Sequence, residues 1–234
     1  EYENPVHRRF HAQPNACPVC GPQVFLLDNK GKQVDGNNPA QAMALAAQFL
    51  RQGKIVAVKG LGGFHLAVDA ANETAVELLR QRKKRPHKPF ALMAAWDSSL
   101  LHHVCMDGDE KALLLSYHRP VVLLKKKALS KSVSTGPAPN LAPDNRCLGI
   151  MLPYTPLHYL LVEKGPDILV MTSGNRSGAP LSIDNAHALD AFSHIADYFL
   201  LHNRDIYFRA DDSIAKIQQG KVRFLRRSRG YAPL

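Results

Sequence analysis

Residues 54–68 read Lys-Ile-Val-Ala-Val-Lys-Gly-Leu-Gly-Gly-Phe-His-Leu-Ala-Val. The apolar runs 54–59 and 64–68 are typical of two buried strands, and the glycine-rich stretch 60–63 between them predicts a tight hairpin turn. The turn does not match a P-loop, because no Lys-Ser or Lys-Thr pair follows at the required spacing and no helix opens there. It does not match the GxGxxG fingerprint either. The stretch therefore predicts two consecutive strands rather than a nucleotide loop.

Helix and strand patterns continue on both sides of this hairpin. Asn38 followed by Pro39 predicts the start of a helix that stops at Gly53, and Asn72 predicts the start of another. Further helices are predicted at 98–104, 109–117, 157–163 and 184–195, a loop at 128–146, and further strands at 23–27, 90–94, 120–124, 167–171, 198–201, 213–217 and 222–225. Because several strands follow one another directly, the predicted fold class is α/β (α+β mixed), a mixed sheet covered by helices.

Length and composition are typical of a globular protein with a sizeable core. Hydrophobic residues make up 45% of the 234, the mean hydropathy is −0.21, and no apolar stretch approaches the roughly 18 residues of a membrane span. The start of the chain has neither the basic residues nor the apolar run of a signal peptide. Four cysteines are too few for a disulfide framework in so long a chain. We therefore expect a cytoplasmic protein with no membrane partner.

The charge balance points to a polyanionic partner. Thirty Lys and Arg residues against twenty Asp and Glu give a formal net charge of +10, which favours nucleic acid, an acidic surface or a phosphorylated small molecule. The basic residues are concentrated in the segments 80–88, 125–131 and 221–229. Any one of these segments alone is more typical of a solvated surface.

Two short segments are candidates for phosphate binding. Lys83-Lys84-Arg85-Pro86 lies where a helix gives way to an extended segment, since Pro86 disfavours helix at the residue before it. Lys83 and Arg85 would then point the same way, although a helix end that simply attracts cations is an alternative. Thr172-Ser173-Gly174-Asn175 ends a predicted strand with small polar groups, where α/β proteins place ligands. The alternative is an ordinary turn.

Taken together, three segments resemble the YrdC-like proteins: 64–69 (Phe-His-Leu-Ala-Val-Asp), 83–86 (Lys-Lys-Arg-Pro) and 173–175 (Ser-Gly-Asn). Within that group, longer motifs are similar to the HypF family, the carbamoyltransferases of nickel–iron hydrogenase maturation. These motifs are 8–22, 59–65 (Lys-Gly-Leu-Gly-Gly-Phe-His), 88–93 (Lys-Pro-Phe-Ala-Leu-Met), 152–158 (Leu-Pro-Tyr-Thr-Pro-Leu-His), 209–213 (Arg-Ala-Asp-Asp-Ser) and 226–233 (Arg-Arg-Ser-Arg-Gly-Tyr-Ala-Pro). They cover essentially the whole chain in the same order, which makes the resemblance specific.

The resemblance implies a YrdC-like twisted mixed sheet with a basic concave face. It also implies that carbamate, derived from carbamoyl phosphate, reacts with ATP to give carbamoyl-adenylate and pyrophosphate for cyanide-ligand synthesis. The implied catalytic residues are Lys83, Arg85, Ser173 and Asn175, and the implied ATP- or substrate-binding residues are Lys59, His65, Lys88, Asp212, Ser213, Arg226, Arg227 and Arg229. Lys59, Gly60 and His65 differ from threonine-using relatives, which favours a smaller substrate. Mg²⁺ is expected with ATP, with Asp212 open as its ligand or as a partner of one, but no metal-binding residue is assigned.

The same resemblance divides the chain in two. Residues 1–36 are expected to be the remnant of a zinc-finger region with its linker, and residues 37–234 a nucleotide-binding adenylation domain. Cys17 and Cys20, in Cys-Pro-Val-Cys, are half of a four-cysteine zinc site, so Zn²⁺ is expected only in a longer parent chain. The implied partners are the remaining domains of that parent and a hydrogenase maturation protein that carries an acceptor cysteine.

Three other functions compete with this interpretation. A threonylcarbamoyl-adenylate synthase for tRNA modification would share the four catalytic residues. A double-stranded RNA-binding module would use the basic concave surface, with an affinity that falls steeply with salt. A non-catalytic docking domain would only scaffold the hydrogenase assembly.

Overall fold

The computed structural model describes residues 3–7, 10, 21–127, 136–175 and 179–232. Its strands are β1 (Val24–Asp28), β2 (Val56–Lys59), β3 (Phe64–Asp69), β4 (Ala91–Ala94), β5 (Val104–Cys105), β6 (Val121–Lys126), β7 (Cys147–Met151), β8 (Ile168–Ser173), β9 (Tyr198–His202), β10 (Ile214–Gln218) and β11 (Lys221–Arg226). Its helices are α1 (Pro39–Arg51), α2 (Glu73–Lys83), α3 (Gly108–Leu115), α4 (Pro156–Lys164) and α5 (Asn185–Phe192), with 3₁₀ turns at Ser99–His103 and Pro139–Leu141.

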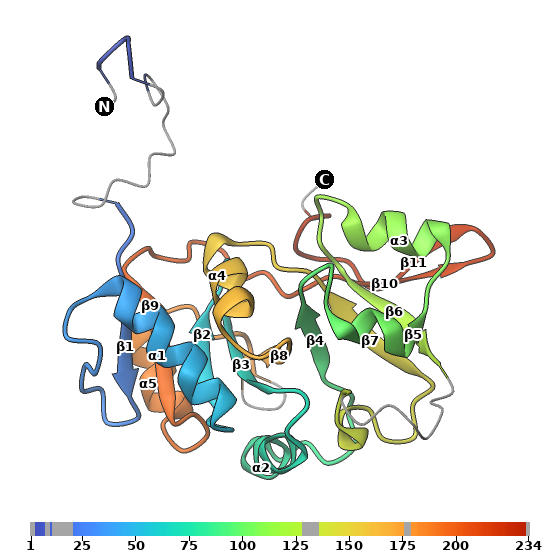
Figure 1. The fold of residues 1–234 in the computed structure, drawn as a ribbon, viewed down its shortest axis with the longest axis horizontal. Coiled ribbons are helices and arrows are strands. Elements are labelled where there is room, and N and C mark those ends of the chain that lie inside the picture. The colour runs from blue at the N-terminus through green and yellow to red at the C-terminus, as the bar shows by residue number, and fades with distance from the viewer. Residues whose placement is uncertain (1–2, 8–9, 11–20, 128–135, 176–178, 233–234) are drawn as a thin grey trace.

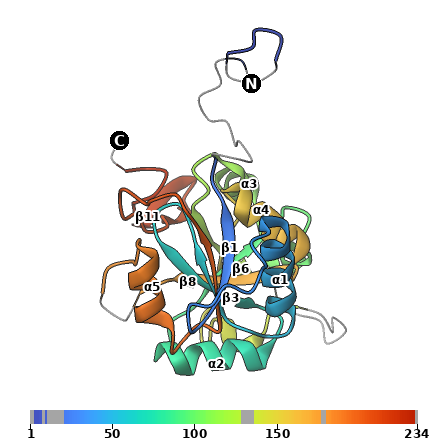
Figure 2. The ribbon, with the colours of Figure 1, turned by 90° about the vertical axis from the view of Figure 1, so that its left-hand side faces the viewer.

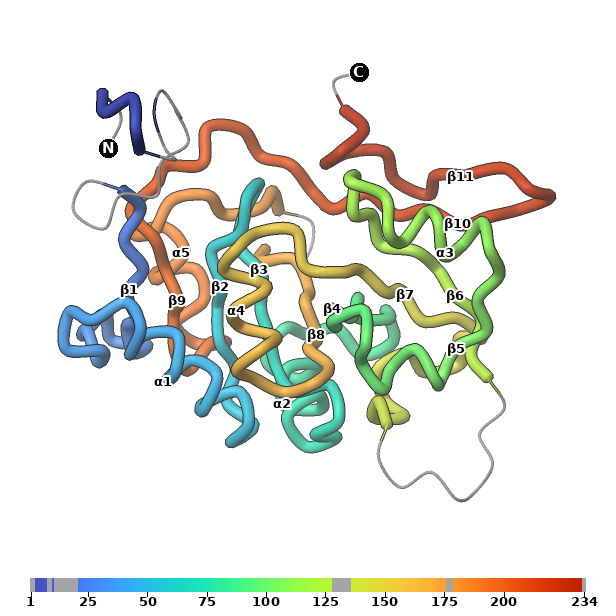
Figure 3. The backbone as a smooth tube through the Cα atoms, turned by 45° about the horizontal axis from the view of Figure 1, so that its top comes forward, coloured from blue at the N-terminus to red at the C-terminus, as the bar shows by residue number. Residues whose placement is uncertain are grey.

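The strands form a single mixed sheet, as predicted (Figure 1). Its order is β1-β9-β2-β3-β8-β4-β7-β6-β10-β11, with β5 paired to β6. The pairs β2–β9, β4–β7 and β6–β10 are parallel, whereas β2–β3, β3–β8 and β10–β11 are antiparallel. The β10–β11 hairpin lies at one end of the sheet (Figure 3).

Helices cover both faces of the sheet because its central strands are apolar on both sides (Figure 2). In β3, Phe64, Leu66 and Val68 pack into one cluster with α2 and α5, while Ala67 faces the other cluster with α1 and α4. This alternation follows from the two-residue period of a strand. The fold class is therefore confirmed as a mixed sheet flanked by helices.

Helix starts agree with the predicted caps. The Asn38 side chain accepts hydrogen bonds from the N–H groups of Ala40 and Gln41, and Asn72 caps α2 through the N–H of Ala75. The 60–63 stretch is the predicted hairpin turn, in which Gly60 N–H donates to Gly63 O at 2.9 Å. Gly62 is required there, because an added Cβ would lie 2.4 Å from Ala210 O.

Two strands of the sheet, β5 and β7, differ from the sequence prediction. The predicted helix 98–104 is a 3₁₀ turn at Ser99–His103 that runs directly into β5. β7 was not predicted, and Gly149 at its centre explains why, since glycine weakens a strand pattern but is needed where a Cβ would lie 2.9 Å from Val121 Cγ1. β1 is the strand predicted at 23–27, but it belongs to the sheet and not to a linker, because it pairs with β9 and its Leu26 N–H donates to the buried Asp35 carboxylate. The domain division at residue 36 stays a prediction, and Cys17 and Cys20 lie outside the described residues.

Candidate functional site

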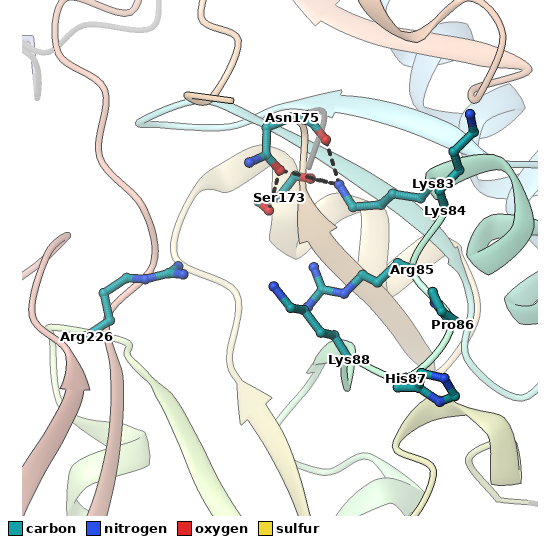
Figure 4. Close-up of a pocket in the computed structure, with 9 residues that line it drawn as sticks. All are labelled: Lys83, Lys84, Arg85, Pro86, His87, Lys88, Ser173, Asn175 and Arg226. Carbon is teal, nitrogen blue, oxygen red and sulfur yellow. Dashed lines mark hydrogen bonds between the residues drawn. The ribbon is translucent and has the colours of Figure 1, made fainter. Parts of the chain in front are cut away.

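A cationic pocket of about 450 Å³ opens where the carboxyl ends of α2 and β8 meet (Figure 4). It is lined by Lys83, Lys84, Arg85, Pro86, His87, Lys88, Ser173, Asn175 and Arg226. All four residues of the predicted tetrad are therefore in one place, together with Lys88 and Arg226. In Figure 4, Arg226 approaches from the side opposite Arg85, whereas the side chains of Lys84 and His87 point away.

The end of α2 sets the direction of the cationic side chains. Lys83 is the last helical residue, and Lys84 caps the helix in the left-handed conformation with φ +50°. The N–H groups of Lys84 and Arg85 both donate to the last turn of α2, at Gln81 O and Arg80 O respectively. This tight turn places Lys83 and Arg85 on the same side of the pocket.

Lys83 joins the two halves of the pocket. Its ammonium group donates to Ser173 O at 2.6 Å and to Asn175 O at 2.9 Å, with a longer contact of 3.4 Å to Asn175 Oδ1. Burial, followed by the neighbouring charge of Arg85, lowers the pKa of Lys83 to about 8. A phosphate placed beside this group would favour its charged form.

The strand end presents oriented polar groups to the same space. Ser173 Oγ donates to Asn175 Oδ1 at 2.8 Å, and Asn175 Nδ2 donates to Ala179 O at 2.8 Å. Gly174 N–H donates to Phe64 O at 2.6 Å, and an added Cβ at Gly174 would lie 2.7 Å from Phe64 Cβ. The segment is thus both a tight turn and part of the pocket wall.

Arg85 is only partly satisfied by protein groups. Its Nη2 donates to Pro89 O at 2.9 Å and its Nη1 contacts Thr172 Oγ1 at 3.4 Å, while its buried Nε has no hydrogen-bond partner among the described residues. Burial and then the nearby charge of Arg80 lower the pKa of Arg85. Guanidinium groups with unused donors are suited to phosphate oxygens.

Three other predicted residues lie in a separate buried cluster. Asp212 Oδ2 contacts His65 Nε2 at 3.0 Å, and Arg229 Nε donates to Asp212 Oδ1 at 2.9 Å. Arg229 also donates to the backbone oxygens of His118 and Arg119. Burial acts to raise the pKa of Asp212, but the contacts with His65 and Arg229 outweigh it and hold that pKa well below its usual range.

Ser213, Lys59 and Arg227 are also outside the lining of the cationic pocket. Ser213 Oγ donates to Arg229 O at 2.9 Å and accepts from Ser228 N–H at 2.8 Å, so it ties the chain exit to β10. Lys59 Nζ donates to His202 O at 3.1 Å and lines a different, largely apolar cavity of about 990 Å³. Arg227 is solvent-exposed.

Some residues near the two sites were not predicted. Arg80 is buried at the end of α2 and donates to five backbone oxygens. The Tyr154 ring lies 3.5 Å from the Arg229 guanidinium carbon and stacks edge-on with buried His158 at 4.5 Å. Tyr154 and His158 belong to the motif 152–158, whereas the only sequence signal for Arg80 was the high density of basic residues in 80–88.

The donor set does not fit a metal ion held directly by the protein. The described lining of the cationic pocket contains no carboxylate, and both oxygens of Asp212 are already paired with cationic or ring nitrogens. Within the described ranges, no cluster of three or more His, Cys, Asp or Glu residues has metal-binding geometry.

Every helix of the described chain is too short or too polar to cross a bilayer.

The mixed sheet and its cationic pocket define an α/β protein suited to bind a phosphorylated small molecule. The chain belongs to the Sua5/YciO/YrdC family, described as telomere recombination, which matches residues 48–228. The HypF finger family matches residues 1–27, so the resemblance to the YrdC-like domain of HypF proteins is confirmed.

Individual relatives agree with this assignment. The carbamoyltransferase HypF of Rhodobacter capsulatus is 49% identical over 234 residues, which is 100% of this chain and 30% of the relative. A crystal structure of full-length HypF in a phosphate- and nucleotide-bound form superposes with a TM-score of 0.86 at 47% identity, covering 99% of this chain and 29% of that one. A crystal structure of T. kodakarensis HypF superposes with a TM-score of 0.89 at 44% identity, covering 100% of this chain and 30% of that one. The chain thus spans about 30% of the length of these relatives.

Proposed function

We propose that this chain catalyses adenylation of carbamate: ATP and carbamate, derived from carbamoyl phosphate, give carbamoyl-adenylate and pyrophosphate. The observation that carries the proposal is the convergence of Lys83, Arg85, Lys88 and Arg226 on a pocket whose other wall is Ser173 and Asn175. The relatives named carbamoyltransferase HypF, one of them solved with phosphate and nucleotide, support it.

The reaction explains why cations and amide donors are needed together. A carbamate oxygen attacks the α-phosphorus of ATP, a new O–P bond forms, and the bond from the α-phosphorus to the β-bridging oxygen breaks. Negative charge then builds on the phosphoryl oxygens and on departing pyrophosphate, so preorganised cations and donors lower the barrier. Lys83 and Arg85 would stabilise that charge, and Ser173 and Asn175 would orient the phosphate.

The choice of carbamate over threonine rests on the resemblance, because Lys59, Gly60 and His65 in the hairpin turn differ from the threonine-using relatives. An added Cβ at Gly60 would lie 2.9 Å from Gly63 O and 3.1 Å from His65 Nδ1. Any side chain at position 60 would therefore clash with Gly63 and His65. Gly60 and His65 form one local arrangement, different from that of the threonine-using enzymes.

Further parts of the proposal concern the protein's setting. Mg²⁺ would be held by the nucleotide's own phosphate oxygens, since the described pocket lining has no carboxylate, and Zn²⁺ would belong to a complete finger in a longer chain. We place the adenylation domain at residues 37–234, in the cytoplasm. The remaining domains of the parent would pass the carbamoyl group to a maturation protein with an acceptor cysteine, for cyanide-ligand synthesis.

ATP–pyrophosphate exchange tests the proposal. Labelled pyrophosphate should enter ATP only when carbamate is present, and Lys83→Ala or Asn175→Ala should abolish exchange. Lys54→Ala, which removes an exposed lysine two residues before β2, is the matched control. Exchange that requires threonine and bicarbonate would overturn the substrate. Tight double-stranded RNA binding without exchange on either substrate would overturn the enzymatic function.

A further inference from the structure

Arg80 is a buried charge that the chemistry of the pocket does not use directly. Only 4% of the residue is exposed, and every hydrogen bond that its guanidinium makes within the described chain ends on a backbone carbonyl oxygen. These acceptors are Asn140 O at 2.7 Å, Leu141 O at 2.9 Å, Arg85 O at 2.8 Å, Pro86 O at 3.3 Å and Lys88 O at 3.0 Å. Burying a cation costs free energy unless the cation is well hydrogen-bonded, and these five bonds meet that requirement.

Three of the five acceptors belong to the phosphate loop, defined as residues 84–88. Nη1 alone bridges the carbonyls of residues 85, 86 and 88. The backbone oxygen of Arg80 meanwhile accepts the N–H of Arg85 at 2.9 Å. Its guanidinium also lies over the Phe90 ring, with 4.4 Å from Cζ to the ring centroid. Arg80 therefore holds the phosphate loop from inside by side chain and backbone.

We propose that Arg80 is a positioning residue that fixes the phosphate loop so that Arg85 and Lys88 face the phosphates of the nucleotide. The inference rests on the proposed function for the identity of the ligand. Lys or Met at position 80 would keep the helix but would lose the planar fork that binds several carbonyls at once.

The hydrogen bonds of Arg80 also affect the electrostatic potential of the pocket. Carbonyl oxygens carry partial negative charge, and any that turned into the pocket would repel phosphate. Arg80 draws three of them toward itself instead. Its charge is also felt in the pocket, since it is the second cause, after burial, of the lowered pKa of Arg85.

Arg82 offers a matched control on the same helix. Its Nη1 donates to Ile195 O at 2.8 Å and to Asp197 Oδ1 at 2.8 Å, so it too makes structural contacts. Neither contact involves residues 84–88. Replacing Arg82 removes an arginine and an ion pair without touching the phosphate loop.

The test is calorimetric titration of the full chain with ATP and with inorganic pyrophosphate, well below the melting temperature of each variant. We expect Arg80→Lys to raise both Kd values roughly tenfold and Arg80→Met roughly 10- to 100-fold. Arg82→Met should lower the melting temperature but change each Kd by less than about twofold. In an Arg85→Met background, the effect of Arg80→Lys should shrink, because one of the groups that it positions is gone.

A folded Arg80→Lys variant that binds both ligands like wild type would overturn the inference, even if its melting temperature falls. Equal effects of Arg80→Lys with and without Arg85 would overturn it too. If Arg80→Met does not fold, the test rests on Arg80→Lys alone and on Arg80→Lys combined with Arg85→Met. If the wild-type chain binds ATP but does not exchange pyrophosphate, the proposed function alone is contradicted. If the wild-type chain binds neither ATP nor pyrophosphate, both the proposed function and the role of Arg80 are contradicted.

Discussion

The lowered pKa of Lys83 predicts an unusual pH dependence of nucleotide binding. An ammonium with the ordinary pKa of 10.5 stays charged through pH 9, whereas burial and Arg85 lower the pKa of Lys83 to about 8. At pH 9 only roughly a tenth of this group is protonated in the free chain. If the bound phosphate needs the charged form, ATP affinity should be flat below pH 7.5 and about tenfold weaker at pH 9.

The assay is titration calorimetry with ATP from pH 7 to 9.5, where a phosphate with a second pKa of about 6 loses no further proton. Binding at pH 8.5 should take up protons, which repeating the titration in buffers of different ionisation enthalpy detects. Lys83→Arg is the control, because its guanidinium stays charged throughout and the dependence on pH should vanish. A wild-type affinity that is constant to pH 9.5 would show that the Lys83 ammonium does not titrate against phosphate.

Three further predictions follow from the two sites. Arg226→Met should weaken ATP binding by about tenfold through loss of one pocket cation, whereas Lys221→Met on the same exposed strand should not, as titration with ATP will show. Asp212→Asn should destabilise the fold by about 3 kcal/mol in urea unfolding, because it leaves the buried Arg229 without its ion pair; an unchanged midpoint would contradict this. Burial lowers the pKa of His158 to about 3, so the unfolded chain binds a proton there that the folded chain does not, and stability falls as pH drops below 6.5. His158→Phe should therefore stabilise the protein at pH 5 by about 2 kcal/mol relative to the same comparison at pH 8, and equal effects at both values would refute it.

Local signals in the sequence were enough for most elements. Asn38 and Asn72 cap their helices through N–H groups two or three residues away, so both the signal and the structure that it predicts lie within one turn. The two consecutive apolar runs of 54–68 likewise predict an antiparallel pair. Each of these elements is therefore indicated by residues within or next to it.

The composition of the cationic pocket depended on distant contacts. Lys83 and Ser173 are 90 positions apart, and the motif match named both without showing that an ammonium–carbonyl bond joins them. The same match grouped Arg226 with Arg229, although one lines the pocket and the other is paired with Asp212 in a separate buried cluster. Arg226 ends β11 whereas Arg229 lies on the irregular segment after it, so strand alternation does not predict their relative directions.

Residue patterns alone thus predict a mixed sheet, the starts of the five α-helices to within about one residue, and the polar groups at the end of β8. Which cations meet those groups, and how Arg80 contacts the loop that carries them, become visible in the folded chain. The difference comes from how far apart in the sequence the interacting residues lie. Caps and alternating burial act over a few residues, whereas the hydrogen bonds of Arg80 to Asn140 and Leu141 cross 60 and 61 positions and depend on how the whole chain packs.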